Sequence, residues 1–497
     1  MADNPAHEKF NIIEQDNNSM KLSNESPIQE LSILPLDPVK EKALLRKLDW
    51  HVLPMITILY MLCFVDRINI GNARIQGLEN DLGMKGSDYN VALFIFFIPY
   101  ILCEVPSNML LKRVKPSTWL SMLMFSWGVI TMCQGFTRSY ASLVVCRFLL
   151  GLFEAGFVPG SFYLISMYYK RYEMQWRFSL FFTGSILSGA WAGLLAYGLA
   201  HMAGIGGYNG WRWIFIIEGL LTIAVSLISK FFIADWPHEA KFLNAEEREI
   251  LARRLQEDTG DAKMDHYDGK AARRIWRDWK MYIGTVMYFG VVNTGYSTSF
   301  FTPTILNQLG FTAIRAQVMS IPVYFAAAVC ALVVALLTDG LKHRYSLCMI
   351  GVLVGTVGYS LLLAQQVLAV SVRYFAVYLI TCGGYITQPV VVAWLANNEA
   401  GHYKRAVSSA FQISVGNIGG IIASNIYLSW QAPTYVIGYA VSLGLLWLCG
   451  LACTIFLVGL WWENRLRDQG KRDHRQQLPP EEIANLGDDH PRFRFTY

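Results

Sequence analysis

Charged side chains are scarce in this sequence. They make up 16% of its 497 residues, whereas about 25% is usual for a soluble protein. Hydrophobic residues reach 54%, and the mean hydropathy is +0.32. The sequence also lacks a Gly-x-x-x-x-Gly-Lys-Ser/Thr phosphate-binding loop, and its apolar runs lack a His-Glu-x-x-His motif, a paired Gly-x-Asp motif and a Ser/Lys dyad. These absences argue against a soluble protein, a nucleotide-driven pump and an intramembrane enzyme.

Cysteine motifs and clustered basic residues are missing as well. All nine cysteines fall inside or at the edge of apolar runs, without a Cys-x-x-Cys motif. They are most simply small apolar residues, so we expect no disulfide, no metal and no cofactor. The formal charge of +5 is not gathered on one face, and nucleic-acid binding is not expected. The first 45 residues have no apolar signal-peptide core and are predicted to be disordered.

Long apolar runs dominate the rest of the chain. A helix needs about 20 apolar residues to cross a bilayer, and twelve runs of about that length are present. The predicted fold class is therefore an all-α integral membrane protein with twelve transmembrane helices. The predicted spans are 50–70, 89–110, 118–137, 140–165, 177–200, 212–234, 280–303, 316–338, 345–364, 371–394, 406–428 and 435–461.

Lysine and arginine are distributed unevenly among the connections between these spans. Alternate connections hold basic groups, such as Lys112, Arg113 and Lys115, then Lys170 and Arg171, while the intervening connections are sparse. Basic connections stay in the cytoplasm, and an even number of spans puts both tails on one side. Both termini are therefore predicted to be cytoplasmic. We expect a monomer in the plasma membrane.

A polar segment divides the spans into two groups of six. It contains FLNAEEREILARRLQED, in which Asn244 and Glu247 have the spacing of a helix capping box. Small residues four apart occur at Gly189 and Gly193 and again at Gly416 and Gly420, indicating two related halves whose helices pack closely. The predicted domains are a disordered tail (1–45), an N-terminal six-helix bundle (46–235), a linker with an amphipathic helix (236–279), a C-terminal six-helix bundle (280–462) and a disordered tail (463–497).

Four full charges lie inside two of the apolar runs. Asp66 and Arg67 are in LYMLCFVDRINIGNA, and Arg147 and Glu154 are in VVCRFLLGLFEAGFVPG. One ionised group at mid-membrane costs at least about 2.5–3.5 kcal/mol on insertion scales. Such residues persist where they face a watery cavity or each other. Two carboxylates and two guanidiniums in one cavity suit the movement of an anion together with a proton.

Five separated motifs carry a family resemblance. They are RKLDWHVLPMITILYMLCFVDRINIGNA at 46–73, CEVPSNMLLKRVKPSTWL at 103–120, RFLLGLFEAGFVPG at 147–160, WPHEAKFLNAEERE at 236–249 and WLANNEAGHYKRA at 394–406. In these motifs the chain resembles the fungal allantoate permease family, an anion:cation symporter branch of the major facilitator superfamily. It looks most like the nicotinate permeases of that family. The resemblance implies proton-coupled uptake of small carboxylates or ureido acids by alternating access.

Arg147 and Glu154 are seven residues apart and share one helix face. An arginine fork matches a carboxylate and does not deprotonate, so Arg147 is the predicted substrate anchor. The resemblance assigns proton coupling to an acid in the first span and an acid in the fourth, which are Asp66 and Glu154. The alternative is an Arg147–Glu154 ion pair that only orients the fourth span.

Asp66 and Arg67 are adjacent and point about 100° apart on a helix, so only one can face a cavity squarely. Asn69 shares a face with Asp66, which favours Asp66 as the residue that faces the cavity. Arg67 is left with two interpretations, a second substrate anchor or a brace to a neighbouring helix.

The second half supplies amides and aromatic rings in place of charges. Asn293, Tyr296, Tyr385 and Gln388 lie in two of its spans and are candidate substrate contacts. The gate of the superfamily uses an acidic loop motif, which survives here as DGLKHR at 339–344. The first half departs from that pattern, because Asn108 stands where the acid is expected, and Glu104 is the candidate replacement. The predicted gating residues are Glu104, Arg113, Asp339 and Arg344.

Two other functions remain compatible with the sequence. Export of a carboxylated metabolite would use the same fold and a similar site. A nutrient sensor of transporter fold that binds without transport would be expected to have a long signalling tail, and both tails here are short.

Overall fold

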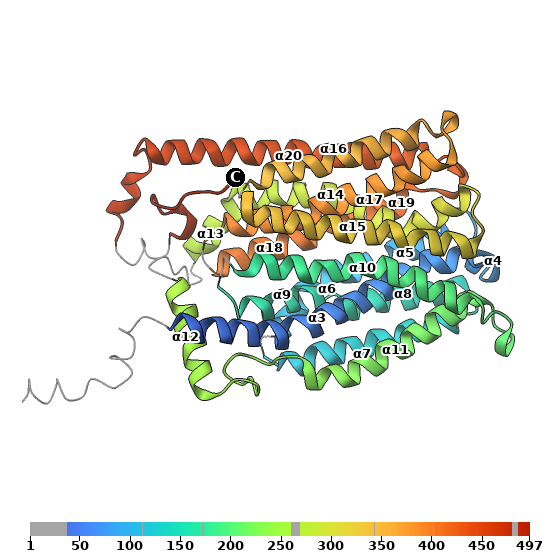
Figure 1. The fold of residues 1–497 in the computed structure, drawn as a ribbon, viewed down its shortest axis with the longest axis horizontal. Helices are drawn as coiled ribbons and strands as arrows, with labels where there is room; N and C mark the ends of the chain where they lie inside the picture. Colours follow the sequence, from blue (N-terminus) through green and yellow to red (C-terminus); the bar gives the residue numbers. More distant parts are fainter. Residues whose placement is uncertain are drawn as a thin grey trace, which may run out of the picture.

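The computed structural model describes residues 37–111, 113–170, 173–259, 269–341, 343–400, 402–479 and 486–497. Within these residues all regular secondary structure is helical. Figure 1 shows long helices lying side by side, with the start of α3 (Pro38–Ile75) and the C terminus at the same end of the bundle. This arrangement fits an even number of membrane crossings.

Each of the twelve predicted spans coincides with one helix or with two consecutive helices, and the predicted all-α membrane fold is confirmed. The single helices are α3, α7 (Pro116–Gly135), α10 (Met174–Ala200), α11 (Gly210–Phe232), α14 (Trp279–Gln308), α15 (Ala313–Leu341), α16 (Arg344–Leu363), α17 (Val370–Asn397) and α20 (Val436–Asp468). The interrupted spans are α5 (Asp88–Phe94) with α6 (Phe97–Leu111), α8 (Tyr140–Glu154) with α9 (Phe157–Ser166), and α18 (His402–Gly416) with α19 (Ile418–Ile426).

In the described part of the chain, nine helical segments are long and apolar enough to cross a membrane by length and composition. Three of the twelve predicted spans do not meet this criterion, and they correspond to α7, α14 and the α18–α19 pair. In α14 the reason is a series of buried polar residues, including Asn293, Thr294, Ser297 and Thr298. These polar groups face protein and not lipid, so the helix can lie in the bundle without satisfying a hydropathy criterion.

Two of the helix interruptions place functional candidates at helix ends. Pro159 in the first turn of α9 has no N–H to donate to the carbonyl of Ala155, which ends α8 at Glu154. Asn417 likewise separates α18 from α19. Broken helices near the bilayer midplane are a common way for transporters to build a binding site.

Small residues bring helices of the two halves together, as their spacing predicts. A Cβ at Gly189 of α10 would lie 2.5 Å from the Tyr324 ring of α15, and a Cβ at Gly193 would lie 2.9 Å from the Gln317 carbonyl oxygen. A Cβ at Gly420 of α19 would overlap the ring of Phe97 in α6 at 2.5 Å. Only glycine permits these approaches.

The linker helix α12 (Ala245–Thr259) begins with the predicted capping box. The Glu247 N–H donates to Asn244 Oδ1 at 2.7 Å, and the Asn244 N–H donates to Glu247 Oε2 at 2.9 Å. Arg254 on the same helix pairs with Glu41 near the start of α3 at 2.7 Å. The linker helix is therefore fastened to the end of the first half.

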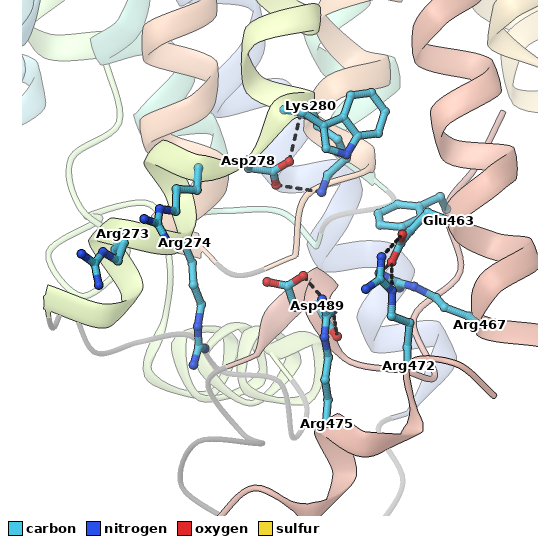
Figure 2. Close-up of a pocket in the computed structure, with 12 residues that line it drawn as sticks. Arg273, Arg274, Asp278, Lys280, Glu463, Arg467, Arg472, Arg475 and Asp489 are labelled. Carbon is cyan, nitrogen blue, oxygen red and sulfur yellow. Dashed lines mark hydrogen bonds and ion pairs between the residues drawn. The ribbon is translucent and has the colours of Figure 1, made fainter.

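The C-terminal tail is folded onto the end of the bundle, which contradicts its predicted disorder. After α20 the chain turns back, so that Arg472 pairs with Glu463 at 2.7 Å and Arg475 pairs with Asp489 at 2.9 Å (Figure 2). Phe495 is buried in the core. The prediction is wrong for the described residues 469–479 and 486–497, because the charges of this segment form ion pairs with one another and with α20.

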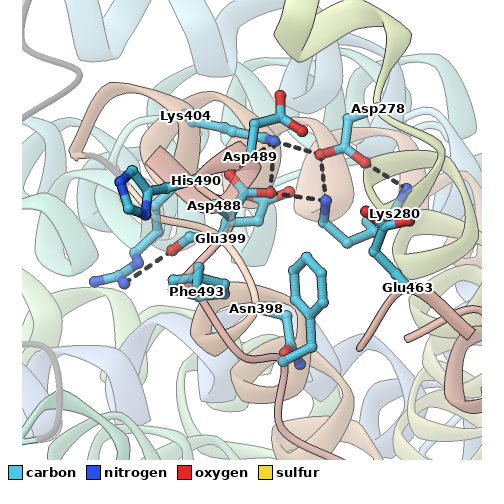
Figure 3. Close-up of polar contacts among 12 residues, drawn as sticks. Asp278, Lys280, Asn398, Glu399, Lys404, Glu463, Asp488, Asp489, His490 and Phe493 are labelled. Atoms are coloured by element: carbon cyan, nitrogen blue, oxygen red, sulfur yellow. Dashed lines mark hydrogen bonds and ion pairs between the residues drawn. The ribbon is translucent and has the colours of Figure 1, made fainter. Parts of the chain in front are cut away.

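Four buried charges anchor the tail, and we call Asp278, Lys280, Lys404 and Asp488 the tail cluster (Figure 3). Lys280 Nζ lies 2.7 Å from Asp278 Oδ2 and 2.7 Å from Asp488 Oδ2. Lys404 Nζ lies 2.9 Å from Asp488 Oδ1 and also pairs with Asp278. Burial alone would raise the pKa of Asp488, but Lys280 and Lys404 hold that pKa well below its usual range.

Candidate functional site

Arg67 and Glu154 form a buried ion pair at the centre of the bundle. Both side chains are at most 2% exposed. Arg67 Nε donates to Glu154 Oε1 at 2.9 Å, and Arg67 Nη2 donates to the same oxygen. The Cys63 thiol also donates to that oxygen at 2.9 Å, whereas Glu154 Oε2 has no hydrogen-bond partner. All of the donors therefore converge on one oxygen of the carboxylate.

The same guanidinium connects the two halves. Arg67 Nη1 donates to the Tyr296 hydroxyl of α14 at 2.6 Å, and that hydroxyl donates to Asn417 Oδ1 at 3.2 Å. The guanidinium carbon lies 4.7 Å from the centroids of both the Phe64 and Phe96 rings. Aromatic faces stabilise a desolvated cation. The neighbours of Arg67 therefore stabilise its positive charge although the side chain is buried away from solvent.

A small cavity adjoins Arg67 between the halves. Its volume is about 10 Å³, which is room for about one water molecule. Its lining residues are mostly aromatic and come from both halves; they are Tyr60, Phe64, Arg67, Tyr100, Val158, Phe162, Phe182, Tyr288, Tyr296, Ile413 and Asn417. This conformation is closed at its centre, and a larger molecule could enter only if the halves separated.

Asp66 does not face this cavity, so the predicted orientation of the Asp66–Arg67 pair is reversed. Asp66 Oδ2 accepts from Thr222 Oγ1 at 2.9 Å and from Trp127 Nε1 at 3.2 Å, while Oδ1 has no partner. Both donors belong to the first half. Asn69, on the Asp66 face, is likewise outside the cavity lining. Adjacent helix positions diverge as expected, but Arg67 is the one that faces the other half.

Glu218 of α11 is a fifth buried charge near this site that the sequence reasoning missed. It is 1% exposed, and its Oε2 accepts a hydrogen bond from the Asn69 amide. Its other oxygen, Oε1, has no partner. The signal was available in IFIIEGLLTIAVS, where a lone glutamate interrupts an apolar run as Glu154 does in its own span. We call Asp66, Arg67, Arg147, Glu154 and Glu218 the central cluster.

Arg147 has no ion pair among the described residues. Its Nη1 donates to the backbone carbonyl of Arg67 at 3.1 Å, and its Nε and Nη2 have no partner. The alternative Arg147–Glu154 pair is not formed, because Arg67 occupies Glu154. Arg147 therefore lies behind Arg67, against the backbone that carries it.

The candidate contacts of the second half separate into one cavity residue and three packing residues. Tyr296 lines the cavity. Asn293 Nδ2 donates to Ser442 of α20 at 3.1 Å, and Tyr385 shares a hydrogen bond of 3.1 Å with Ser299. Gln388 packs close to Gly295 and does not line the cavity.

The predicted gating residues do not form one group. Glu104 of α6 is fully buried, and neither of its carboxylate oxygens has a hydrogen-bond partner in the described structure. Arg113 is exposed to solvent. Arg344 binds the tail, with Nη1 donating to Thr496 Oγ1 at 3.1 Å. The Asp339 side chain lies outside the described residues.

Polar contacts between the halves are concentrated at the end of the bundle opposite the termini. Arg74 Nη2 donates to Ser429 at 3.1 Å, Gln76 donates to Gln317 at 3.3 Å, and Asn90 donates to the Ser424 carbonyl at 2.5 Å. Arg67 and Tyr296 form a further side-chain hydrogen bond across the halves, at the centre of the bundle. That end is therefore sealed by hydrogen bonds as well as by helix packing. The described residues contain no group of His, Cys, Asp and Glu side chains arranged for a metal ion.

The sequence was also compared with known proteins. Residues 56–424 match the model of the Major Facilitator Superfamily. An uncharacterized transporter of Schizosaccharomyces pombe is 36% identical over 438 residues, covering 88% of this chain and 86% of that protein. The MFS-type transporter cnsO of Penicillium expansum is 36% identical, with coverage of 92% and 90%. The high-affinity nicotinic acid transporter of Saccharomyces cerevisiae is 28% identical, with coverage of 92% and 85%.

A solved structure shares the fold. It is a bacterial homolog of the human lysosomal transporter Spinster in an inward-facing and unoccupied conformation, with a TM-score of 0.60 and 18% sequence identity. The match covers 85% of this chain and 97% of the bacterial chain.

Proposed function

This chain belongs to the major facilitator superfamily, and from that premise we propose that it imports a small organic anion by proton symport. Membership makes it a multi-pass secondary transporter and not an enzyme. The coupling ion, the substrate class and the direction are the proposal. We also propose that it acts as a monomer in the plasma membrane, with both termini in the cytoplasm.

Arg67 carries this proposal. It is a permanent cation buried between the halves, it lines the central cavity, and it contacts both Glu154 and Tyr296. A guanidinium binds a carboxylate through two parallel N–H groups, and it cannot release its charge by deprotonation. We therefore propose Arg67 as the substrate anchor in place of Arg147, which acts as a positioning residue through the Arg67 backbone.

Glu154 couples the anion to a proton by competition for Arg67. While Glu154 is ionised, it occupies the Nε and Nη2 groups of Arg67. A proton on Glu154 removes that charge and releases the guanidinium for the carboxylate of the substrate. The pair then binds one anion and one proton together, or neither, which is the requirement for symport.

Asp66 is proposed as the second proton-binding residue. Its Oδ1 has no partner, so a proton can be accepted without displacing the hydrogen bonds from Thr222 and Trp127. Glu218, which also has an oxygen without a partner, is a further candidate on the same side of the first half. A chain of buried acids within a bundle is a recognised route for protons.

The closed centre and the sealed end support alternating access. With about 10 Å³ at the centre, substrate binding requires the halves to move apart. The hydrogen bonds of Arg74, Gln76 and Asn90 would break on opening toward the outside. Glu104, buried on α6, which packs against α18, stays our proposed gating residue.

The aromatic lining favours a flat aromatic carboxylate as substrate. Tyr60, Tyr100, Tyr288 and Tyr296 line the cavity together with Arg67, and their rings could stack on a pyridine ring while Arg67 binds its carboxylate. The similarity to a nicotinic acid transporter points in the same direction. A nicotinate-like acid is the proposed substrate, and the allantoate permease family is the proposed branch.

Uptake into proteoliposomes tests this function. Purified protein is reconstituted, and labelled nicotinate, allantoate, pantothenate and ureidosuccinate are offered with an inward proton gradient and without one. We expect gradient-driven accumulation of at least one of these acids. Accumulation that is driven by an outward gradient would indicate export, and binding without movement would indicate a sensor. Either result would contradict the proposal.

A further inference from the structure

A second cavity lies at the end of the bundle that carries the termini. It is formed by α13 (Gly269–Arg277), the start of α14, the end of α20 and the folded C-terminal tail (Figure 2). Its volume is about 420 Å³, within the usual range for a small-ligand site. Seven of its lining residues are Arg or Lys and three are Asp or Glu. The lining residues are Arg273, Arg274, Arg277, Asp278, Trp279, Lys280, Glu463, Arg467, Arg472, Arg475, Asp489 and Phe495.

The carboxylates of this cavity do not neutralise all of its cations. Glu463 is shared by Arg467 and Arg472, at 3.5 Å and 2.7 Å. Asp489 is taken by Arg475, and Asp278 belongs to the tail cluster. The cavity therefore has more positive charge than its own acids can pair.

The excess charge is concentrated on α13. Arg273 and Arg277 are exposed and have no carboxylate within ion-pair distance among the described residues. They are four residues apart, so they share one helix face, where like charges repel. An anion placed between them would remove that repulsion and gain charge-assisted hydrogen bonds.

Tryptophans place the cavity beside the lipid. Trp279 lines the cavity and is 38% exposed, and its ring packs on Gly459 of α20. Trp461 and Trp462 directly precede Glu463 in α20, and they are 47% and 57% exposed. Tryptophan collects at the level of the lipid headgroups. The cavity thus adjoins the membrane interface on the side predicted to be cytoplasmic, where anionic lipids are found.

We propose that this cavity binds a polyanion that carries two or more phosphate groups, with Arg273, Arg277 and Arg472 as the main contacts. Arginine forks match phosphate oxygens, and basic pockets at the cytoplasmic ends of membrane helices bind phosphorylated headgroups. The ligand chemistry is common to a phosphorylated inositol lipid and a soluble inositol polyphosphate. This site is separate from the transport site at Arg67, and a single small carboxylate would leave its charge unbalanced.

Binding to the purified full-length chain in neutral detergent tests the proposal. The probes are dioctanoyl phosphatidylinositol bisphosphate, inositol trisphosphate and dioctanoyl phosphatidylcholine. The test variant is Arg273→Gln with Arg277→Gln. Its matched control, Lys42→Gln with Arg46→Gln, removes the same charge from exposed positions of α3 at the same end of the bundle. Melting temperature shows that both variants are folded.

We expect at least one phosphate probe to bind, phosphatidylcholine not to bind, and the test variant to weaken binding at least about tenfold, while the control changes it less than about twofold. Inositol trisphosphate that binds as tightly as the lipid would identify a soluble ligand. Binding that requires the acyl chains would identify a lipid. Equal weakening in both variants, or no phosphate probe that binds more tightly than phosphatidylcholine, would overturn the proposal.

Discussion

The central cluster and the tail cluster are two sets of buried charges that differ in how completely their members are paired. In the tail cluster every charge has an oppositely charged partner, and Lys280 and Lys404 each contact both acids. In the central cluster Arg67 and Glu154 are paired, whereas each acid has an oxygen without a partner and Arg147 has two nitrogens without one. Buried charges with unused bonding capacity can accept a proton or an anion. Fully paired charges mainly fix the structure.

Glu399 is an exception beside the tail cluster. It is fully buried, and neither of its carboxylate oxygens has a hydrogen-bond partner in the described structure. Burial raises its pKa to about 8, against the partial opposing effect of Lys404. The connection between α17 and α18, which lies against the tail cluster, therefore contains one group that titrates near neutral pH.

The largest effect is expected for the anchor. Arg67→Ala should lower substrate uptake by about 100-fold or more, because two charge-assisted hydrogen bonds to a carboxylate are lost. Arg67→Lys keeps the charge but not the fork and should be intermediate. Initial uptake rates in proteoliposomes measure this. Arg147→Ala provides the comparison, and a greater loss there than in Arg67→Ala would return the anchor to Arg147.

The next effect concerns Asp66. Asp66→Asn retains an oxygen that can accept from Thr222 and Trp127, and it removes only the charge. Proton-driven accumulation should fall about tenfold, as expected when a buried proton-binding acid is lost. The ratio of internal to external substrate at steady state is the measurement. An accumulation ratio equal to that of the wild type would assign Asp66 a structural role.

Breaking the tail cluster should affect stability and not coupling. Asp488→Asn leaves Lys280 and Lys404 with Asp278 as the only remaining acid of the cluster, and removal of one partner from a buried ion pair costs about 3–5 kcal/mol. We expect a lower melting temperature and an unchanged transport rate per folded molecule at permissive temperature. An unchanged melting temperature would mean that the tail contributes little to the fold.

The smallest effect is a pH dependence of the tail. Glu399 has a pKa raised from its ordinary value of 4.5 to about 8 in the folded state, so the folded state binds the proton more tightly. Its contribution to stability is complete below about pH 4.5 and is lost as the pH rises toward 8. Hydrogen exchange in residues 486–497 should therefore accelerate over that range. Glu399→Gln should remove this dependence, and an identical pH profile in the variant would exclude Glu399 as its source.

Much of the fold could be predicted from the sequence because hydropathy acts locally. All twelve spans and the capping box at Asn244 follow from patterns within a few residues. The folded tail could not be predicted in this way. Asp488 is paired with Lys280 and Lys404, which are distant in the sequence, and the composition of the tail resembles that of a disordered segment.

The site could be predicted in its residue types but not in its orientations. The insertion cost identifies Arg67 and Glu154, yet helical geometry says only that Asp66 and Arg67 diverge. Which of them faces the second half depends on the rotation of α3, and this is set by contacts with Thr222, Trp127 and Tyr296 in other helices. Asn69 shares a helix face with Asp66, but it donates to Glu218 of the same half, so its position does not indicate which face of α3 lines the cavity.

The central claim is that protonation of Glu154 breaks its ion pair with Arg67 and thereby frees the guanidinium to bind the carboxylate of the substrate. The most direct test compares Glu154→Gln with the wild type in two assays, accumulation driven by a proton gradient and counterflow exchange without one. Glu246→Gln, at an exposed position of α12, is the control. The account predicts that Glu154→Gln loses gradient-driven accumulation and retains exchange. Undiminished accumulation in Glu154→Gln would contradict it.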